Sequence, residues 1–145
     1  MAKKRYIGPN FILELKLYPN RHMIRTLDRL FRCSEKMYNQ LVYFANGQLK
    51  KMRADKDYIR ILDLYNKEKD EDVKKQYGNQ LAEIREQYYL TSNYFETYVN
   101  NLRNKSYKNK IDSNTAQKLG LRVWKSVSSL LFGKGKKVHF KKFNT

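Results

Sequence analysis

Residues 112–143, DSNTAQKLGLRVWKSVSSLLFGKGKKVHFKKF, decide the predicted fold. Asp112, Ser113 and Asn114 occupy the expected N-cap region of a helix, where their side-chain oxygens can accept hydrogen bonds from the free N–H groups of the first turn. Apolar residues then recur at helical spacing and define the face that packs: Ala116, Leu119, Val123, Val127 and Leu130. The sequence therefore predicts an amphipathic helix that ends before Gly133.

The outer face of this helix is basic, and so is the segment that follows it. From Arg103 onward there are twelve Lys or Arg and a single acid, Asp112. Beyond a hinge at Gly133 and Gly135, apolar residues alternate with basic ones, which predicts a short strand near residues 137–143. A packed helix with a basic outer face, hinged to a basic strand, suits a nucleic-acid backbone.

A second strand is predicted near the start of the chain. Residues 1–10 form a basic leader that ends in a Gly-Pro turn signal, and residues 11–18 alternate, with Leu13, Leu15 and Leu17 on one side. An isolated strand leaves backbone groups unpaired, and the sequence offers no other strand candidates. We therefore expect the two strands to be neighbours.

A long basic helix should follow over residues 19–54, with Asn20 as its N-cap. Its predicted packed face consists of Ile24, Leu27, Phe31, Ser34, Tyr38, Leu41 and Ala45. Its second stripe is cationic and consists of Arg21, Arg25, Arg29, Arg32 and Lys36. The stripe is either a phosphate-binding surface or an ordinary solvated face, and adjacent like charges on it repel by a few tenths of a kcal/mol, about 0.2–0.5 per pair. We expect this stripe and that of the last helix to line one groove.

The middle of the chain differs in charge. Residues 55–90 are acidic and should form two helices, near 58–67 and 72–90. Residues 91–132 should hold two more helices, the first opened by a capping box of Asn93 and Glu96, and residues 133–145 the hinge and strand. The predicted fold is a single domain of class α+β, mostly α, with a helical bundle inserted between two short neighbouring strands.

Composition narrows the function. The 145 residues carry a net charge of +17, which favours polyanions, and 41% hydrophobic residues, which argues against a disordered basic tail. No apolar run approaches the roughly 20 residues that span a bilayer, and no signal core follows the basic leader. The one cysteine, Cys33, is best interpreted as a small core residue in a reducing cytosol, so a cytoplasmic protein is expected.

Motifs of catalysis are missing from the sequence. The two histidines, His22 and His139, lie far from each other and from Cys33, and no metal-ligand spacing, P-loop, dinucleotide motif or nucleophile elbow occurs. Glu83 and Glu86 share a helix face, but exposed acids at this spacing are ordinary. The sequence predicts a binding module rather than an enzyme, with no cofactor and no metal.

Short motifs in a fixed order also suggest a family. The first group is Leu17-Tyr18-Pro19-Asn20, Cys33 and Tyr38-Asn39; the second is Ser113-Asn114-Thr115-Ala116-Gln117, Leu131-Phe132, Gly133-Lys134-Gly135 and Phe140-Lys141-Lys142. Over residues 11–46 and 91–143 the chain resembles the N-terminal region of the TnpB/OrfB-type transposon proteins, RNA-guided nucleases related to the type V CRISPR effectors. In that family, a strand of a wedge-type barrel leads into a helical recognition domain and the chain then returns to the barrel.

The resemblance has departures. The family usually has Thr or Ser where Asn20 stands, a Gln near His22-Met23, and a proline where Val138-His139 precedes the Phe-Lys strand. The carboxylates and zinc ribbon of the family's nuclease part have no counterpart in this sequence. The resemblance therefore implies binding of guide RNA and target duplex without cleavage.

The sequence thus predicts a module that binds structured guide-type RNA or an RNA–DNA heteroduplex, and no membrane. Two alternatives stay open: a stand-alone remnant that inhibits a related effector by competing for its RNA or partner, and a helical interaction protein for an acidic protein or membrane surface. The residues expected to contact nucleic acid are Lys3, Lys4, Arg5, Tyr18, Arg21, Arg25, Arg29, Arg32, Lys118, Arg122, Trp124, Lys125, Lys134, Lys136, Lys137, His139, Lys141 and Lys142.

Overall fold

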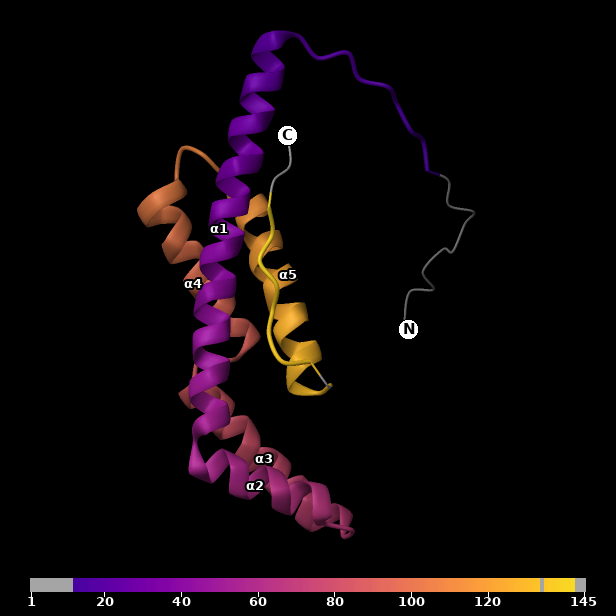
Figure 1. Cartoon of the computed structure of the whole chain (residues 1–145), viewed down its shortest axis with the longest axis vertical. Coiled ribbons are helices and arrows are strands. Elements are labelled where there is room, and N and C mark those ends of the chain that lie inside the picture. Colours follow the sequence, from indigo (N-terminus) through magenta and orange to yellow (C-terminus); the bar gives the residue numbers. More distant parts are fainter. Residues whose placement is uncertain (1–11, 134, 143–145) are drawn as a thin grey trace, which may run out of the picture.

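The chain is mostly helical, as the computed structural model of residues 12–133 and 135–142 shows (Figure 1). In chain order its elements are α1 (Arg21–Ala54), α2 (Lys56–Lys67), α3 (Glu71–Gln87), α4 (Ser92–Leu102), the π-helix η1 (Arg103–Tyr107) and α5 (Ser113–Leu131). The mostly-α part of the predicted fold class is confirmed. No strand forms within the described ranges, so the α+β part is wrong.

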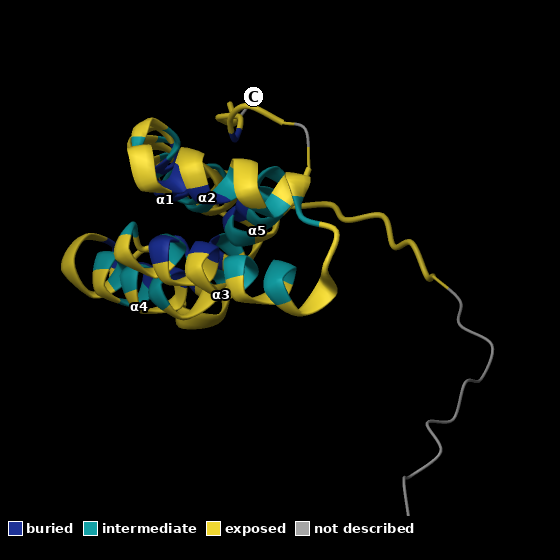
Figure 2. Ribbon diagram, turned by 90° about the horizontal axis from the view of Figure 1, so that it is seen from below, coloured by how far each residue is buried: buried dark blue, intermediate teal, exposed yellow. Residues whose placement is uncertain are grey.

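The core lies where α1, α4 and α5 pack together (Figure 2). The C-terminal part of α1 contributes Met37, Leu41 and Val42, which are fully buried. α4 contributes Phe95 and Val99, and α5 its predicted face, of which Ala116, Val123 and Val127 are buried and Leu119 and Leu130 half-buried. The helical spacing read from the sequence thus identified the inner face of α5.

Side-chain caps fix where the helices begin. Asn20 Oδ1 accepts a hydrogen bond from the Met23 N–H at 2.9 Å, and Asp112 Oδ2 accepts one from Thr115 at 3.2 Å, so both predicted N-caps are confirmed. The cap of α4 is Thr91, whose hydroxyl oxygen accepts from the Tyr94 N–H. The capping box predicted at Asn93 is wrong, because Thr91 offers an equivalent oxygen two residues earlier.

The acidic middle of the chain forms a helical hairpin of α2 and α3, close to the predicted boundaries. Asp55 holds the corner between α1 and α2. Its carboxylate accepts hydrogen bonds from the N–H groups of Asp57 and Tyr58 and, at 2.5 Å, from the hydroxyl of Tyr88 at the end of α3. These hydrogen bonds lower the pKa of Asp55, that from Tyr88 most. Asp55 therefore ties three helices together, because its backbone N–H also donates to the Met52 carbonyl oxygen of α1.

The two segments predicted as strands are not neighbours. Residues 12–20 are exposed throughout and run away from the bundle at the N-terminal end of α1 (Figures 1 and 2). Residues 135–142, here called the C-terminal segment, run back between α1 and α5. The segment is extended, as predicted, but its backbone groups bond to side chains of α1 and not to another strand.

Two asparagines of α1 hold this segment by paired hydrogen bonds. Asn46 accepts from the N–H of Val138 and donates to its carbonyl oxygen, both at 2.9 Å. Asn39 accepts from the N–H of Lys141 at 2.9 Å and donates to its carbonyl oxygen at 2.8 Å. A primary amide can replace a neighbouring strand in this way because it offers one donor and one acceptor side by side. The predicted strand is therefore bound by side-chain amides of a helix, whereas strand prediction considers only pairing with another strand.

The spacing of these contacts departs from that of a strand in a sheet. Asn39, Asn46 and Arg53 recur every seven residues along α1, which is about 10.5 Å of helix. Arg53 donates to the carbonyl oxygens of Gly135 and Lys136 at 3.2 and 2.6 Å. The bonded positions of the segment therefore recur about every three residues, roughly 9–10 Å of extended chain, which matches the helix repeat. The predicted two-residue alternation is wrong: Val138 is buried, whereas Phe140 is 56% exposed.

The N-terminal half of α1 extends beyond the bundle. Ile24, Leu27 and Phe31, predicted to be packed, are 44%, 40% and 48% exposed. From Met37 onward the same helix is packed against its neighbours. The apolar periodicity therefore predicts the packed face correctly only in the C-terminal part of α1, where Tyr38, Leu41 and Ala45 are buried.

Replacing Asn46 with Ala should release the C-terminal segment. The change leaves the N–H and the carbonyl of Val138 without partners, at a cost of about 1–3 kcal/mol for two hydrogen bonds. We expect faster tryptic cleavage after Lys136 and Lys137 under native conditions. The control is Asn79→Ala on the exposed surface of α3, and equal cleavage rates in the two variants would contradict the role of Asn46.

Asp55→Asn should destabilise the fold at neutral pH and not in acid. Asn keeps the ability to cap α2, so the variant removes mainly the charge that Tyr88 binds. Because folding lowers the pKa of Asp55, its contribution is complete above the ordinary value of about 3.9 and is lost as the pH falls through the lowered pKa. The difference in melting temperature, followed by circular dichroism, should therefore shrink below about pH 4. A pH-independent difference would contradict this origin, and Asp63→Asn, in an exposed pair with Lys67, is the control.

Candidate nucleic-acid interface

Three cations from two distant parts of the chain meet beside Tyr38 of α1. Arg122 of α5 and Lys141 and Lys142 of the C-terminal segment line a pocket of about 170 Å³. Lys141 Nζ lies 4.9 Å from the centre of the Tyr38 ring, a cation–π contact. The other lining residues are Phe31, Ser34, Glu35, Tyr38 and Leu119. We call Arg122, Lys141 and Lys142 the cation cluster.

The pKa of the Tyr38 hydroxyl reflects both its burial and the nearby charge of Arg122. Burial raises the pKa of its hydroxyl, and the nearby charge of Arg122 opposes that rise. The ring is buried, and it contacts Lys141 of the cluster. The pocket therefore presents three cations and one carboxylate, that of Glu35.

A second hollow continues from the cluster along α5. It has a volume of about 630 Å³ and lies between Ser126 and Ser129 of α5 and residues 135–141 of the C-terminal segment. Lys136, Lys137 and His139 are exposed along it. The predicted contacts of the C-terminal segment and of Arg122 are therefore brought together in one elongated basic groove.

The arginines of α1 connect to this groove through helix geometry. Arg25 and Arg32 belong to the same seven-residue row as Asn39, Asn46 and Arg53. A row at this spacing follows one edge of a helix with a drift of only about 20° per repeat. Arg25 and Arg32 therefore continue the edge along which the C-terminal segment is bound, and both are exposed.

The remaining predicted contacts are placed elsewhere. Arg21, at the start of α1, lies on the part of the helix that extends beyond the bundle (Figure 1), so the two cationic stripes do not face each other along their lengths. Tyr18 is 83% exposed in the segment before α1, and Arg29, Lys118 and Lys125 are exposed on their helices. Trp124 is half-buried and turns toward α4. Four predicted residues lie outside the described ranges: Lys3, Lys4, Arg5 and Lys134.

Most described tyrosines near basic sequence or in the bundle have structural contacts. Tyr107, which lies in basic sequence, is buried, and its hydroxyl donates to Gln40 Oε1 at 2.9 Å. Tyr94 stacks on Tyr89 with ring centres 4.5 Å apart, and Phe44 stacks on Tyr98 at 4.5 Å. The stacks of Phe44 on Tyr94 and Tyr98 hold α4 against α1, whereas Tyr89 is 48% exposed.

Sequence reasoning missed the residues that build the groove. Asn39 and Asn46 were not candidates, because a polar residue in a helix usually faces solvent; their seven-residue spacing was the available signal. Tyr38 was assigned to the packed face, which is correct, but its contact with Lys141 depends on the position of the C-terminal segment.

In the described ranges no group of His, Cys, Asp and Glu could hold a metal ion. Of the helices found there, none has the length and apolar character needed to cross a membrane.

Comparisons with known proteins add no relative. No model of a known protein family matches the chain, and searches of curated proteins and of solved structures find no significant match either. The interface must therefore be interpreted from its own geometry.

Proposed function

We propose that this chain is a nucleic-acid-binding module that holds structured RNA, or an RNA–DNA heteroduplex, along the basic groove between α1, α5 and the C-terminal segment. The observation that carries the proposal is the cation cluster. Packing and hydrogen bonds place Arg122, Lys141 and Lys142 around one pocket, where they outnumber the single carboxylate of Glu35, so the pocket attracts a phosphate backbone. Phosphate contacts dominate such an interface, so its sequence preference is weak.

The distribution of charge supports this surface over others. The net charge is +17, yet nine acids and seven bases occupy residues 55–86, so the excess positive charge lies outside the hairpin of α2 and α3. The hairpin projects from the C-terminal end of α1, which is the end opposite to its exposed start (Figure 1). A polyanion is therefore attracted to the groove and not to the hairpin.

The kind of RNA follows from the sequence resemblance to TnpB/OrfB-type proteins. We propose a guide-type RNA, bound without cleavage, in a cytoplasmic setting. Among the residues that the structure describes, no group of Asp, Glu, His and Cys could hold the metal ions of a two-metal nuclease site, and we therefore propose a binding role. A remnant of this kind would inhibit a related effector by competing for its RNA.

Replacing Arg122, Lys141 and Lys142 together with Gln should weaken binding to a structured RNA and lower its salt dependence. Each phosphate contact contributes about 0.7–0.9 to the slope of log affinity against log salt, so the slope should fall by roughly two. Electrophoretic mobility shifts at several salt concentrations measure both quantities. The backbone contacts of Lys141 with Asn39 remain in the variant.

The matched control removes the same charge from the hairpin: Lys67, Lys69 and Lys74 replaced together with Gln. We expect this variant to keep most of its affinity and nearly the full salt slope, because these lysines lie outside the groove. An equal loss in both triple variants would show that only net charge matters, and the groove assignment would then be wrong.

One observation favours the alternative of a helical interaction protein with an acidic partner. Met23, Ile24 and Leu27 are exposed apolar residues of α1, beside its arginines. A partner that combines apolar and acidic residues would cover both. Purification of the full chain at low salt distinguishes the two functions. Protein that carries no co-purified RNA and does not shift structured RNA in an electrophoretic assay favours the protein partner.

A further inference from the structure

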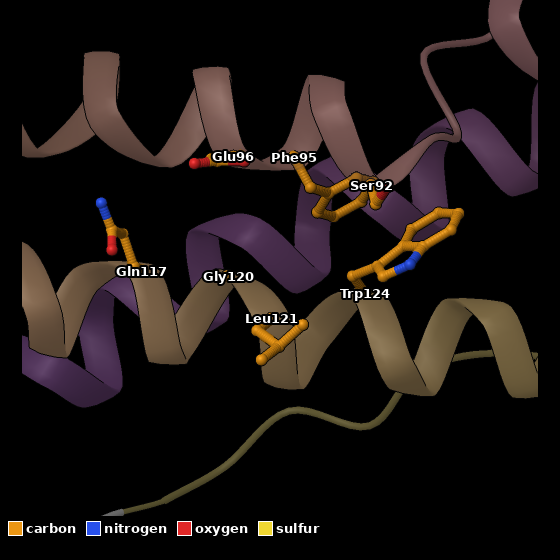
Figure 3. Close-up of a pocket in the computed structure, with 7 residues that line it drawn as sticks. All are labelled: Ser92, Phe95, Glu96, Gln117, Gly120, Leu121 and Trp124. Carbon is orange, nitrogen blue, oxygen red and sulfur yellow. The ribbon is translucent and has the colours of Figure 1, made fainter. Parts of the chain in front are cut away.

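A small cavity lies between α4 and α5, on the side of α5 away from the C-terminal segment (Figure 3). Its volume is about 220 Å³, and its lining is Ser92, Phe95 and Glu96 of α4 with Gln117, Gly120, Leu121 and Trp124 of α5. This is below the roughly 300–1,000 Å³ of pockets for drug-sized ligands. A single ring system is the size of ligand that fits.

The cavity has an aromatic end. Trp124 and Phe95 face each other there, with ring centres 5.6 Å apart and planes tilted by 47° (Figure 3). Trp124 is half-buried, so part of the indole is open to a ligand. Such a wall favours a flat, unsaturated ligand.

A glycine makes the floor between the two ends. A Cβ at position 120 would collide with Val99 Cγ2, so the close approach of α4 and α5 requires Gly120. Val99 of α4 occupies the space above this position, so the two closely packed helices form the closed floor of the cavity. Leu121, 52% exposed, forms the outer rim.

The opposite end of the cavity is polar. Glu96 from α4 and Gln117 from α5 point toward each other across the gap (Figure 3). Both side chains are exposed, and no hydrogen bond joins either of them to another residue of the described ranges. The carboxylate can only accept hydrogen bonds, whereas the amide can accept and donate. Hydrogen-bonding capacity is thus concentrated on one edge of an otherwise apolar space.

We propose that this cavity binds a single unpaired nucleobase, and guanine in preference to the other three. The proposal rests on the nucleic-acid-binding function proposed above. Guanine presents two adjacent N–H donors and a carbonyl acceptor on its Watson–Crick edge. Glu96 accepts from the two donors and the Gln117 amide donates to the carbonyl. The other bases do not combine two adjacent donors with an acceptor, so each leaves part of this polar end without a partner.

The position of the cavity fits a strand that crosses α5. Lys118 and Lys125 each follow a cavity residue, Gln117 and Trp124, by one position, so they lie about 100° further around the helix. Both lysines are exposed. A single-stranded segment whose phosphates contact these lysines can direct one unstacked base into the cavity, the usual way in which proteins recognise RNA sequence. The cavity supplies base preference, which the phosphate-binding groove lacks.

The chain contains one tryptophan, Trp124, and it lies in the cavity, so its fluorescence reports occupancy directly. The full chain is titrated with GMP, AMP, CMP and UMP, with excitation where tyrosine does not absorb. Because all four carry the same phosphate, differences between them report the base. We expect GMP to quench Trp124 at the lowest concentration. Equal quenching by all four nucleotides, or by none, would overturn the proposal.

Two variants test the polar edge. Glu96→Gln replaces one acceptor with a donor and should weaken the GMP response by about tenfold or more, as expected for losing a charged partner. Glu83→Gln on α3 removes the same charge far from the cavity and should leave the response unchanged. If both variants behave alike, the edge does not recognise guanine.

The RNA mobility shift separates this proposal from the function on which it rests. RNA binding without a guanine-selective change in Trp124 fluorescence would contradict only the cavity. A guanine-selective change in a protein that does not shift structured RNA would contradict the groove and keep the cavity.

Discussion

Hydrogen bonds from two asparagines of α1 to the backbone of the C-terminal segment determine how this protein is organised. Asn46 binds Val138 and Asn39 binds Lys141, each through one donor and one acceptor. Without these bonds, the backbone groups of Val138 and Lys141 would be left to water, and the segment would be held only by Arg53, by the buried side chain of Val138 and by the contact of Lys141 with Tyr38. With them, its lysines are held against α1 and α5.

The same hydrogen bonds bring the positive charges of the cation cluster together. Lys141 and Lys142 are brought beside Arg122, although about twenty residues and a glycine hinge separate them in the chain. The three cations outnumber the one carboxylate of the pocket, Glu35, so the pocket carries a local excess of positive charge. A surface with such an excess attracts polyanions, which is the basis of the proposed function.

The helices could be predicted from the sequence, but the contacts that hold the C-terminal segment could not. Caps at Asn20 and Asp112 and the periodic face of α5 are local signals, and they were correct. The prediction of the segment's partner was wrong because it assumed that an extended stretch needs a second strand. Side-chain amides from a helix serve equally well. Charge alone identified Arg122, Lys141 and Lys142, but their meeting beside Tyr38 depends on contacts between residues about a hundred positions apart. The cavity beside Trp124 depends on the packing of α4 on α5, which local patterns do not specify.

Residue-resolved hydrogen exchange of the C-terminal segment tests the three-residue register most directly. Among residues 136–142 only the N–H groups of Val138 and Lys141 donate to α1. We expect slow exchange at these two positions and fast exchange at Lys137, His139 and Phe140. Protection at Val138, Phe140 and Lys142 would instead show the two-residue alternation of a paired strand and would contradict the asparagine-bound segment.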